Sequence, residues 1–95
     1  MTKETAEKHA IRDYLRLNGW FVYHNLAGLG CYAGLADLTA LRNGVVVQIE
    51  VKTPKGKQSD KQIIFAKEWK DRGGYYVIGD FEIVKSFVEV FYGKN

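Results

Sequence analysis

The pair Asn43-Gly44 separates two runs of strand-forming residues, 36–42 and 45–53. A type I′ turn requires positive φ at both of its central residues, and Asn and Gly adopt that conformation at little cost. The two runs are therefore predicted to pair as an antiparallel hairpin with a two-residue loop. This register fixes which side chains oppose one another along the hairpin.

Periodicity along the rest of the chain predicts further helices and strands. Helices are expected over 5–18, 59–72 and 81–92, the last of them helical or mixed, and strands over 20–24 and 75–79. The order α-β-β-β-α-β-α predicts an α/β fold with a central mixed β-sheet flanked by helices. The 95-residue chain is expected to form a single domain.

Charge and cysteine content narrow the classes of function. The net charge is only +3, but basic residues outnumber acidic ones between residues 52 and 72, where they are Lys52, Lys55, Lys57, Lys61, Lys67, Lys70 and Arg72. Such a segment suits a polyanionic partner, and it equally suits solvated surface. The lone Cys31 cannot form an internal disulfide, which favours a cytoplasmic protein. The chain has no run of about 18 apolar residues, which excludes a membrane-spanning helix.

The predicted register places two acids opposite one another, because Asp37 faces Glu50 across the hairpin. Alternation along the strands puts Lys52 on the same face as both acids. Opposed carboxylates repel, and a divalent cation between them would remove that repulsion. Lys52 would then stabilise negative charge on an attacked phosphate or assist deprotonation of water. The alternative is an exposed cluster in which Lys52 only screens two surface acids.

One further acid falls on an apolar helical face. At 100° per residue the inward stripe of the first helix contains Ala6, Ala10, Ile11, Tyr14, Leu15 and Leu17. Glu7 lies close to the centre of that stripe. Burying an unpaired carboxylate is costly, so Glu7 is expected to meet a charged partner or a metal ion.

These residues resemble a known family. The motifs are, in chain order, Glu7 with Leu15 and Gly19, then Gly34-Leu35-Ala36-Asp37, Glu50-Val51-Lys52-Thr53-Pro54-Lys55-Gly56 and Ser59-Asp60-Lys61-Gln62. Together they are similar to the VRR-Nuc family of the PD-(D/E)xK nuclease superfamily, in its compact stand-alone form from phages and their bacterial hosts. Ala36 departs from the proline that the family commonly has there, which bears on strand entry and not on a ligand.

The resemblance implies a restriction-endonuclease-like core and phosphodiester hydrolysis that depends on Mg²⁺ or Mn²⁺. It assigns Asp37, Glu50 and the Val51 carbonyl to the metal, and Lys52 to catalysis. It gives Glu7 a supporting role at the metal, directly or through water. Stand-alone members are similar to dimeric Holliday-junction resolvases, so a homodimer acting on branched DNA is implied.

The remaining candidate residues each allow two interpretations. The family places a glutamine near the site at Gln62, whereas Ser59 and Gln62 also have the spacing of a helix capping box. Lys55, Lys57 and Lys61 flank the predicted site. They either contact DNA phosphates or only keep the surface soluble. Tyr32, in a glycine-rich loop, is a further candidate for DNA binding.

The resemblance therefore implies a homodimeric endodeoxyribonuclease selective for four-way DNA junctions. One alternative is a nuclease for flaps, nicks or other branched DNA with the same chemistry. A second is a catalytically silent DNA-binding module of the same fold, although such a module has little reason to keep opposed carboxylates that repel phosphate. An RNA-binding domain with stacked aromatic residues is a weaker alternative.

Overall fold

The predicted hairpin forms in the computed structural model, which describes residues 1–93. Strand β2 (Leu38–Arg42) pairs antiparallel with β3 (Val45–Val51), and between them Asn43 and Gly44 have φ values of 50° and 81°. Positive φ at both positions is what a type I′ turn requires. The predicted register is confirmed over all five residues of β2.

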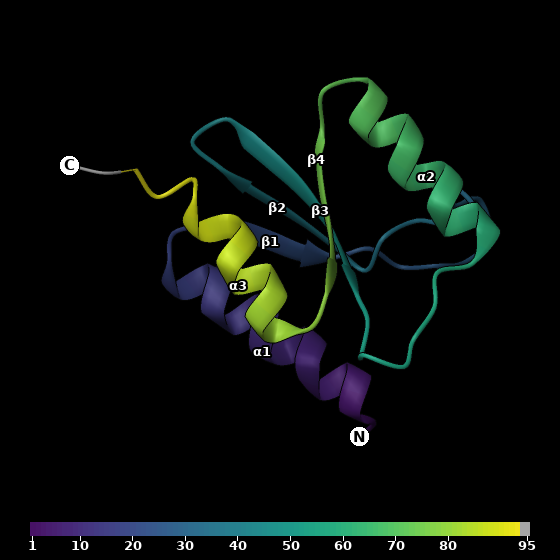
Figure 1. The fold of residues 1–95 in the computed structure, drawn as a ribbon, viewed down its shortest axis with the longest axis horizontal. Coiled ribbons are helices and arrows are strands. Elements are labelled where there is room, and N and C mark those ends of the chain that lie inside the picture. Colours follow the sequence, from purple (N-terminus) through teal and green to yellow (C-terminus); the bar gives the residue numbers. More distant parts are fainter. Residues whose placement is uncertain (94–95) are drawn as a thin grey trace.

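Two further strands complete the sheet. Strands β1 (Phe21–His24) and β4 (Tyr75–Gly79) lie at its edges, and the strand order is β1-β2-β3-β4. Strand β1 runs antiparallel to β2, whereas β4 runs parallel to β3. A parallel pair needs a crossover connection, and helix α2 supplies it between β3 and β4 (Figure 1). The predicted mixed sheet is confirmed.

Each helix begins after a side chain that accepts a hydrogen bond from a backbone N–H of its first turn. The caps and their helices are Thr2 before α1 (Lys3–Leu17), Ser59 before α2 (Asp60–Asp71) and Asp80 before α3 (Phe81–Glu89). Helices α1 and α3 cover one face of the sheet and α2 covers part of the other (Figure 1). Within residues 1–93 no helix is both long and apolar enough to cross a membrane.

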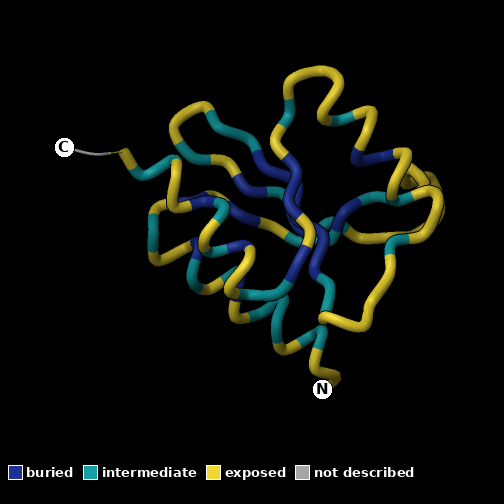
Figure 2. The backbone as a smooth tube through the Cα atoms, in the orientation of Figure 1, coloured by how far each residue is buried: buried dark blue, intermediate teal, exposed yellow. Residues whose placement is uncertain are grey.

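The main core lies between the sheet and helices α1 and α3, where the buried backbone segments meet (Figure 2). Its fully buried members include Ile11 and Leu15 of α1. Leu17, predicted to point inward, is instead 87% exposed. Two residues correspond to about 200° of rotation around a helix, so Leu17 faces away from the sheet when Leu15 faces it.

The opposite face of the sheet carries polar side chains that are nevertheless buried. Gln48 is 4% exposed and Glu50 is 2% exposed. Asn25, Thr39 and Gln48 hydrogen-bond to one another over distances of 2.8 to 3.1 Å, so these polar groups have partners. The alternative of an exposed surface cluster is therefore wrong for Glu50, which needs compensation for its burial.

Candidate active site

Asp37 lies where the hairpin leaves its regular pairing. Its backbone N–H donates to the Ile49 carbonyl at 3.0 Å, one residue short of the predicted partner Glu50. Its side chain accepts the backbone N–H of Val51 through Oδ2 at 2.8 Å. Regular pairing therefore ends at Leu38, and the strict opposition predicted for Asp37 and Glu50 is not formed. The shift instead fixes the Asp37 carboxylate against the backbone of β3.

Asn25 forms two hydrogen bonds to the chain on the other side of Asp37. The Asn25 backbone N–H donates to the Asp37 carbonyl at 2.8 Å, and its side-chain amide donates to the Ala36 carbonyl at 3.0 Å. These two bonds fix the chain at Ala36 and Asp37, where it enters β2. Asp37 is therefore anchored by backbone contacts from both neighbouring strands.

Glu50 is the most deeply buried acid of the site. Its Oε2 accepts a hydrogen bond from Gln62 Nε2 at 2.8 Å and lies 3.3 Å from Lys52 Nζ. Its Oε1 is buried and has no hydrogen-bond partner within the described residues. Burial, followed by the negative charge of Asp37, raises the pKa of Glu50 from 4.5 to about 7, although Lys52 opposes the rise. The two acids therefore interact despite the altered register.

Gln62 both caps helix α2 and contacts Glu50, so the two interpretations of this residue apply together. The side-chain Oε1 of Gln62 accepts the Ser59 backbone N–H at 2.8 Å, and the backbone N–H of Gln62 donates to Ser59 Oγ at 3.2 Å. These two bonds make the capping box. Because the cap occupies the amide oxygen, the amide nitrogen is left to donate to Glu50. The helix cap thus orients a hydrogen-bond donor toward the candidate site.

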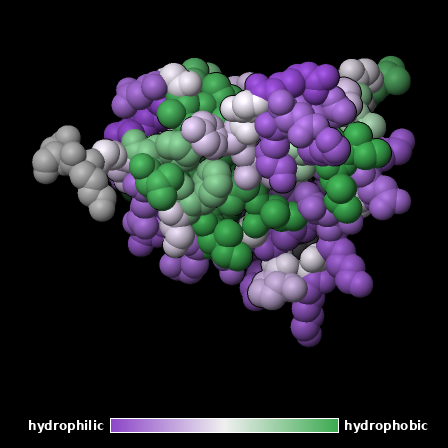
Figure 3. Space-filling view, turned by 45° about the horizontal axis from the view of Figure 1, so that its top comes forward, coloured by the Kyte–Doolittle hydropathy of each residue, from purple (hydrophilic) through white to green (hydrophobic). Residues whose placement is uncertain are grey.

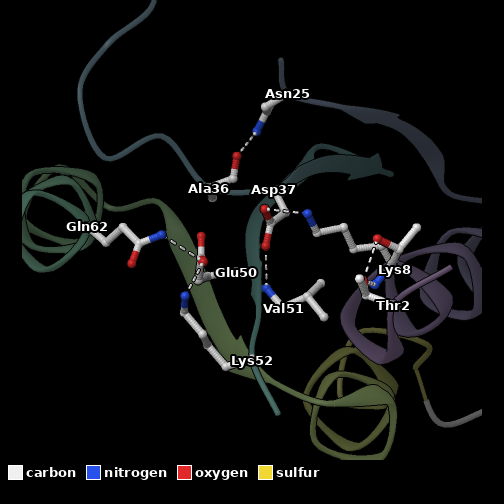
Figure 4. A network of polar contacts seen from close by, with 10 residues as sticks. Thr2, Lys8, Asn25, Ala36, Asp37, Glu50, Val51, Lys52 and Gln62 are labelled. Carbon is white, nitrogen blue, oxygen red and sulfur yellow. Dashed lines mark hydrogen bonds and ion pairs between the residues drawn. The ribbon is translucent and has the colours of Figure 1, made fainter. Parts of the chain in front are cut away.

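Figure 4 shows the side chains converging from different elements: Gln62 and Lys52 approach Glu50, and Lys8 approaches Asp37 from α1. Lys52 follows β3 directly, and its backbone N–H donates to the Gly79 carbonyl at 2.9 Å. This bond continues the pairing of β3 with β4, so the backbone of Lys52 is fixed beside Glu50. The structure therefore brings Asp37, Glu50, Lys52 and Gln62 together.

Glu7, by contrast, is directed toward another element. Its carboxylate accepts the backbone N–H of Phe81 at 3.2 Å, at the start of α3. A carboxylate is favourable there because the first N–H groups of a helix lack partners within the helix. The sequence predicted a charged partner or a metal ion for Glu7, and the partner found within the described structure is the N-terminus of a helix.

Two residues of α1 that were not predicted lie closer to the acids. Lys8 Nζ is 3.2 Å from Asp37 Oδ1, and the charge of Glu4 contributes to the raised pKa of Glu50. Their spacing was the available signal, since Glu4 and Lys8 extend the stripe of Ile11 and Leu15 by one turn each.

The acids suit a divalent cation bound by oxygen. The partnerless Glu50 Oε1 is a buried acceptor, and a nearby second carboxylate raises the cost of charging it. Hard cations such as Mg²⁺ are held by one or two carboxylates, with water and phosphate completing the shell. In the part of the chain that the structure describes, no three His, Cys, Asp or Glu side chains converge on one such point. Asp37 and Glu50 are the two carboxylates that could bind such an ion.

The predicted DNA contacts lie on the surface of the protein. Lys55, Lys57 and Lys61 are exposed. Tyr32 lines a hollow of about 390 Å³ along α2, together with Phe65, Glu68, Trp69, Arg72 and Gly74. Neither acid of the candidate site lines this hollow, so the hollow is separate from the acids at the start of β2 and the end of β3.

Gly34 joins the loop that carries Tyr32 to helix α2. Its φ is +83°, and a Cβ atom at this position would lie 2.1 Å from the Lys61 carbonyl oxygen. Only glycine allows so close an approach in that conformation. The glycine loop therefore packs directly against the N-terminal turn that carries Gln62.

Comparisons with known proteins agree with this fold. No family model matches the sequence, and no curated protein matches it. A solved structure described as a VRR_NUC domain matches with a TM-score of 0.82 and 27% sequence identity, covering 97% of this chain and 100% of the other. The resemblance carried by the motifs is thereby confirmed: over nearly its whole length the chain has the nuclease-type fold of the VRR-Nuc family.

Proposed function

We propose that this protein is a metal-dependent, structure-selective endodeoxyribonuclease, acting as a homodimeric Holliday-junction resolvase. The observation that carries the proposal is the buried Glu50, whose Oε1 has no partner in the described structure and whose pKa is raised by burial and by Asp37. A structural acid would be expected to have its oxygens paired. The similarity to a VRR_NUC domain supports the same chemistry.

Each residue of the site has a role in this proposal. Asp37, Glu50 and the Val51 carbonyl would hold Mg²⁺ or Mn²⁺, with Glu7 as a more distant support through water. When bound, the ion supplies positive charge to the phosphate and acidifies a water molecule. Lys52 would place its ammonium beside the phosphate, where negative charge develops during attack. Gln62 would orient Glu50 through its hydrogen bond.

DNA would approach over the basic surface around the site. Lys55, Lys57 and Lys61 are exposed and would contact phosphates without reading sequence. Tyr32, 56% exposed, would contact the DNA from the glycine loop. Selectivity would then come from the shape of the DNA.

Exposed apolar side chains support self-association. The large exposed ones include Phe21 at 65%, Leu26 at 81%, Leu29 at 110% and Ile64 at 55%. Figure 3 shows apolar residues gathered on the middle of one face. Monomeric soluble proteins rarely expose large contiguous apolar patches. A twofold dimer would also present two sites, as the symmetric cleavage of a four-way junction requires.

The test is a cleavage assay with Mg²⁺ or Mn²⁺ on a four-way junction beside flap, nicked, linear and single-stranded DNA. Symmetric cuts in the junction are expected. Preferred cleavage of flaps or nicks would favour the alternative of a nuclease for other branched DNA. Binding without cleavage of any substrate would identify a catalytically silent module. Sedimentation should show a dimer, and a monomer at micromolar concentration would contradict the paired-site account.

A further inference from the structure

Lys8 forms an ion pair with the oxygen of Asp37 that is not bonded to the backbone of β3. Oδ2 of Asp37 accepts the Val51 N–H at 2.8 Å, whereas Oδ1 lies 3.2 Å from Lys8 Nζ. The side chains of Lys8 and Asp37, which point toward one another in Figure 4, are 27% and 20% exposed, so the pair is largely enclosed but reaches solvent. A cation that binds Asp37 through Oδ1 therefore meets the Lys8 ammonium.

We propose that Lys8 competes with the divalent ion for Asp37, and that it turns to a DNA phosphate when the ion binds. This inference rests on the proposed function. Metal–oxygen distances for Mg²⁺ are about 2.1 Å, so two cations on Oδ1 would lie within about 5 Å of each other. At that separation a divalent ion and an ammonium repel strongly. Ion binding would therefore drive Lys8 away from Asp37.

The lysine has the freedom to make this move. It has a flexible four-carbon stem, unlike a guanidinium fixed in a planar fork. Its ammonium pairs with Asp37 alone among the described salt bridges, while Lys52 pairs with the buried Glu50. The two lysines are thus divided between the two acids, and the one on the less buried acid can be displaced into solvent.

The exchange would couple ion binding to DNA binding. Without DNA, the ion must break the contact of Lys8 with Asp37. With DNA, a phosphate beside the ion gives the displaced ammonium a new partner, so ion and DNA would each strengthen the binding of the other. Lys8 would then be a positioning residue that favours loading of the ion when substrate is present.

The test measures Mn²⁺ binding to the whole chain by titration calorimetry, without DNA. Removing the competing charge with Lys8→Met should lower the Kd for Mn²⁺ about tenfold, because the ion no longer has to break the Lys8–Asp37 ion pair, and a pair of unit charges 3.2 Å apart in water is worth roughly that factor. Lys8→Arg, which keeps the charge, should stay near the wild-type value. Lys3→Met is the matched control, since Lys3 is an exposed lysine of the same helix.

The possible outcomes separate this inference from the proposed function. The competition is supported if Lys8→Met binds Mn²⁺ more tightly than wild type while Lys8→Arg and Lys3→Met do not. It is also supported if Lys8→Met is the one variant that binds Mn²⁺ measurably. Measurable but equal Kd values for wild type and Lys8→Met overturn it and leave the nuclease proposal standing. If no folded variant binds Mn²⁺, both proposals fail. Circular dichroism checks folding, and Lys8→Gln replaces Lys8→Met if the latter does not fold.

Discussion

Replacing Glu50 with glutamine should make the protein more stable at neutral and alkaline pH in the absence of metal. In the folded protein the pKa of Glu50 is raised from 4.5 to about 7, chiefly by burial. A raised pKa in an acid means that the folded state binds the proton more tightly than the unfolded state. The stabilising contribution is therefore complete below about pH 4.5 and is lost as the pH rises to 7.

The size of this effect follows from the same pKa values. A change from 4.5 to about 7 corresponds to roughly 3 kcal/mol of unfolding free energy. Glutamine cannot ionise and so avoids this cost. Between about pH 4.5 and pH 8, the stability of Glu50→Gln relative to wild type should therefore rise by roughly 3 kcal/mol. That is a large fraction of the total stability of a small domain.

The assay is urea unfolding in EDTA at several pH values, followed by tryptophan fluorescence. Glu89→Gln, a change at an exposed acid outside the site, is the matched control. Parallel pH profiles for Glu50→Gln and wild type would refute the raised pKa of Glu50. Adding Mg²⁺ at pH 8 should stabilise wild type more than Glu50→Gln, because ligand that binds the folded state raises its stability.

Three further substitutions test other parts of the site. Lys52→Ala should lower turnover on cleaved DNA about 100-fold or more with a smaller effect on DNA affinity, and near-normal turnover would remove it from catalysis. Gln62→Glu keeps the capping box but removes the hydrogen-bond donor to Glu50. Helix α2 should therefore stay folded while the pH profile of cleavage moves to higher pH. An unchanged profile would show that Gln62 acts only as a helix cap. Gly34→Ala should destabilise the protein by about 2 kcal/mol or more in urea unfolding, and a neutral effect would contradict the close approach to Lys61.

Local chemistry explains why most of the fold was predictable. The Asn43-Gly44 turn requires only the two residues that form it, and the helix cap Ser59 acts within one turn. Alternation along β3 likewise identified both the apolar face and the polar row of Glu50 and Lys52. These signals depend on neighbours in the chain, so the sequence contains them.

The remaining details depend on contacts between distant segments. The pairing of Asp37 shifts by one residue and its side chain accepts the Val51 N–H, and no periodicity in the sequence reveals either feature. The partner of Glu7 is set by α3, whose packing against α1 is a tertiary contact. Lys8 had a visible helical spacing, but only the docking of α1 shows that it reaches Asp37.

The most direct test of the central claim compares wild type with Asp37→Asn in Mg²⁺-dependent cleavage of a four-way junction. Asparagine keeps an oxygen for the Val51 N–H but removes the negative charge that would hold the ion. We expect wild type to cut the junction in Mg²⁺ and not in EDTA. Asp37→Asn should fold but should not cleave the junction. Cleavage by Asp37→Asn at the wild-type rate, or wild-type cleavage that persists in EDTA, would contradict a metal-dependent nuclease built on Asp37 and Glu50.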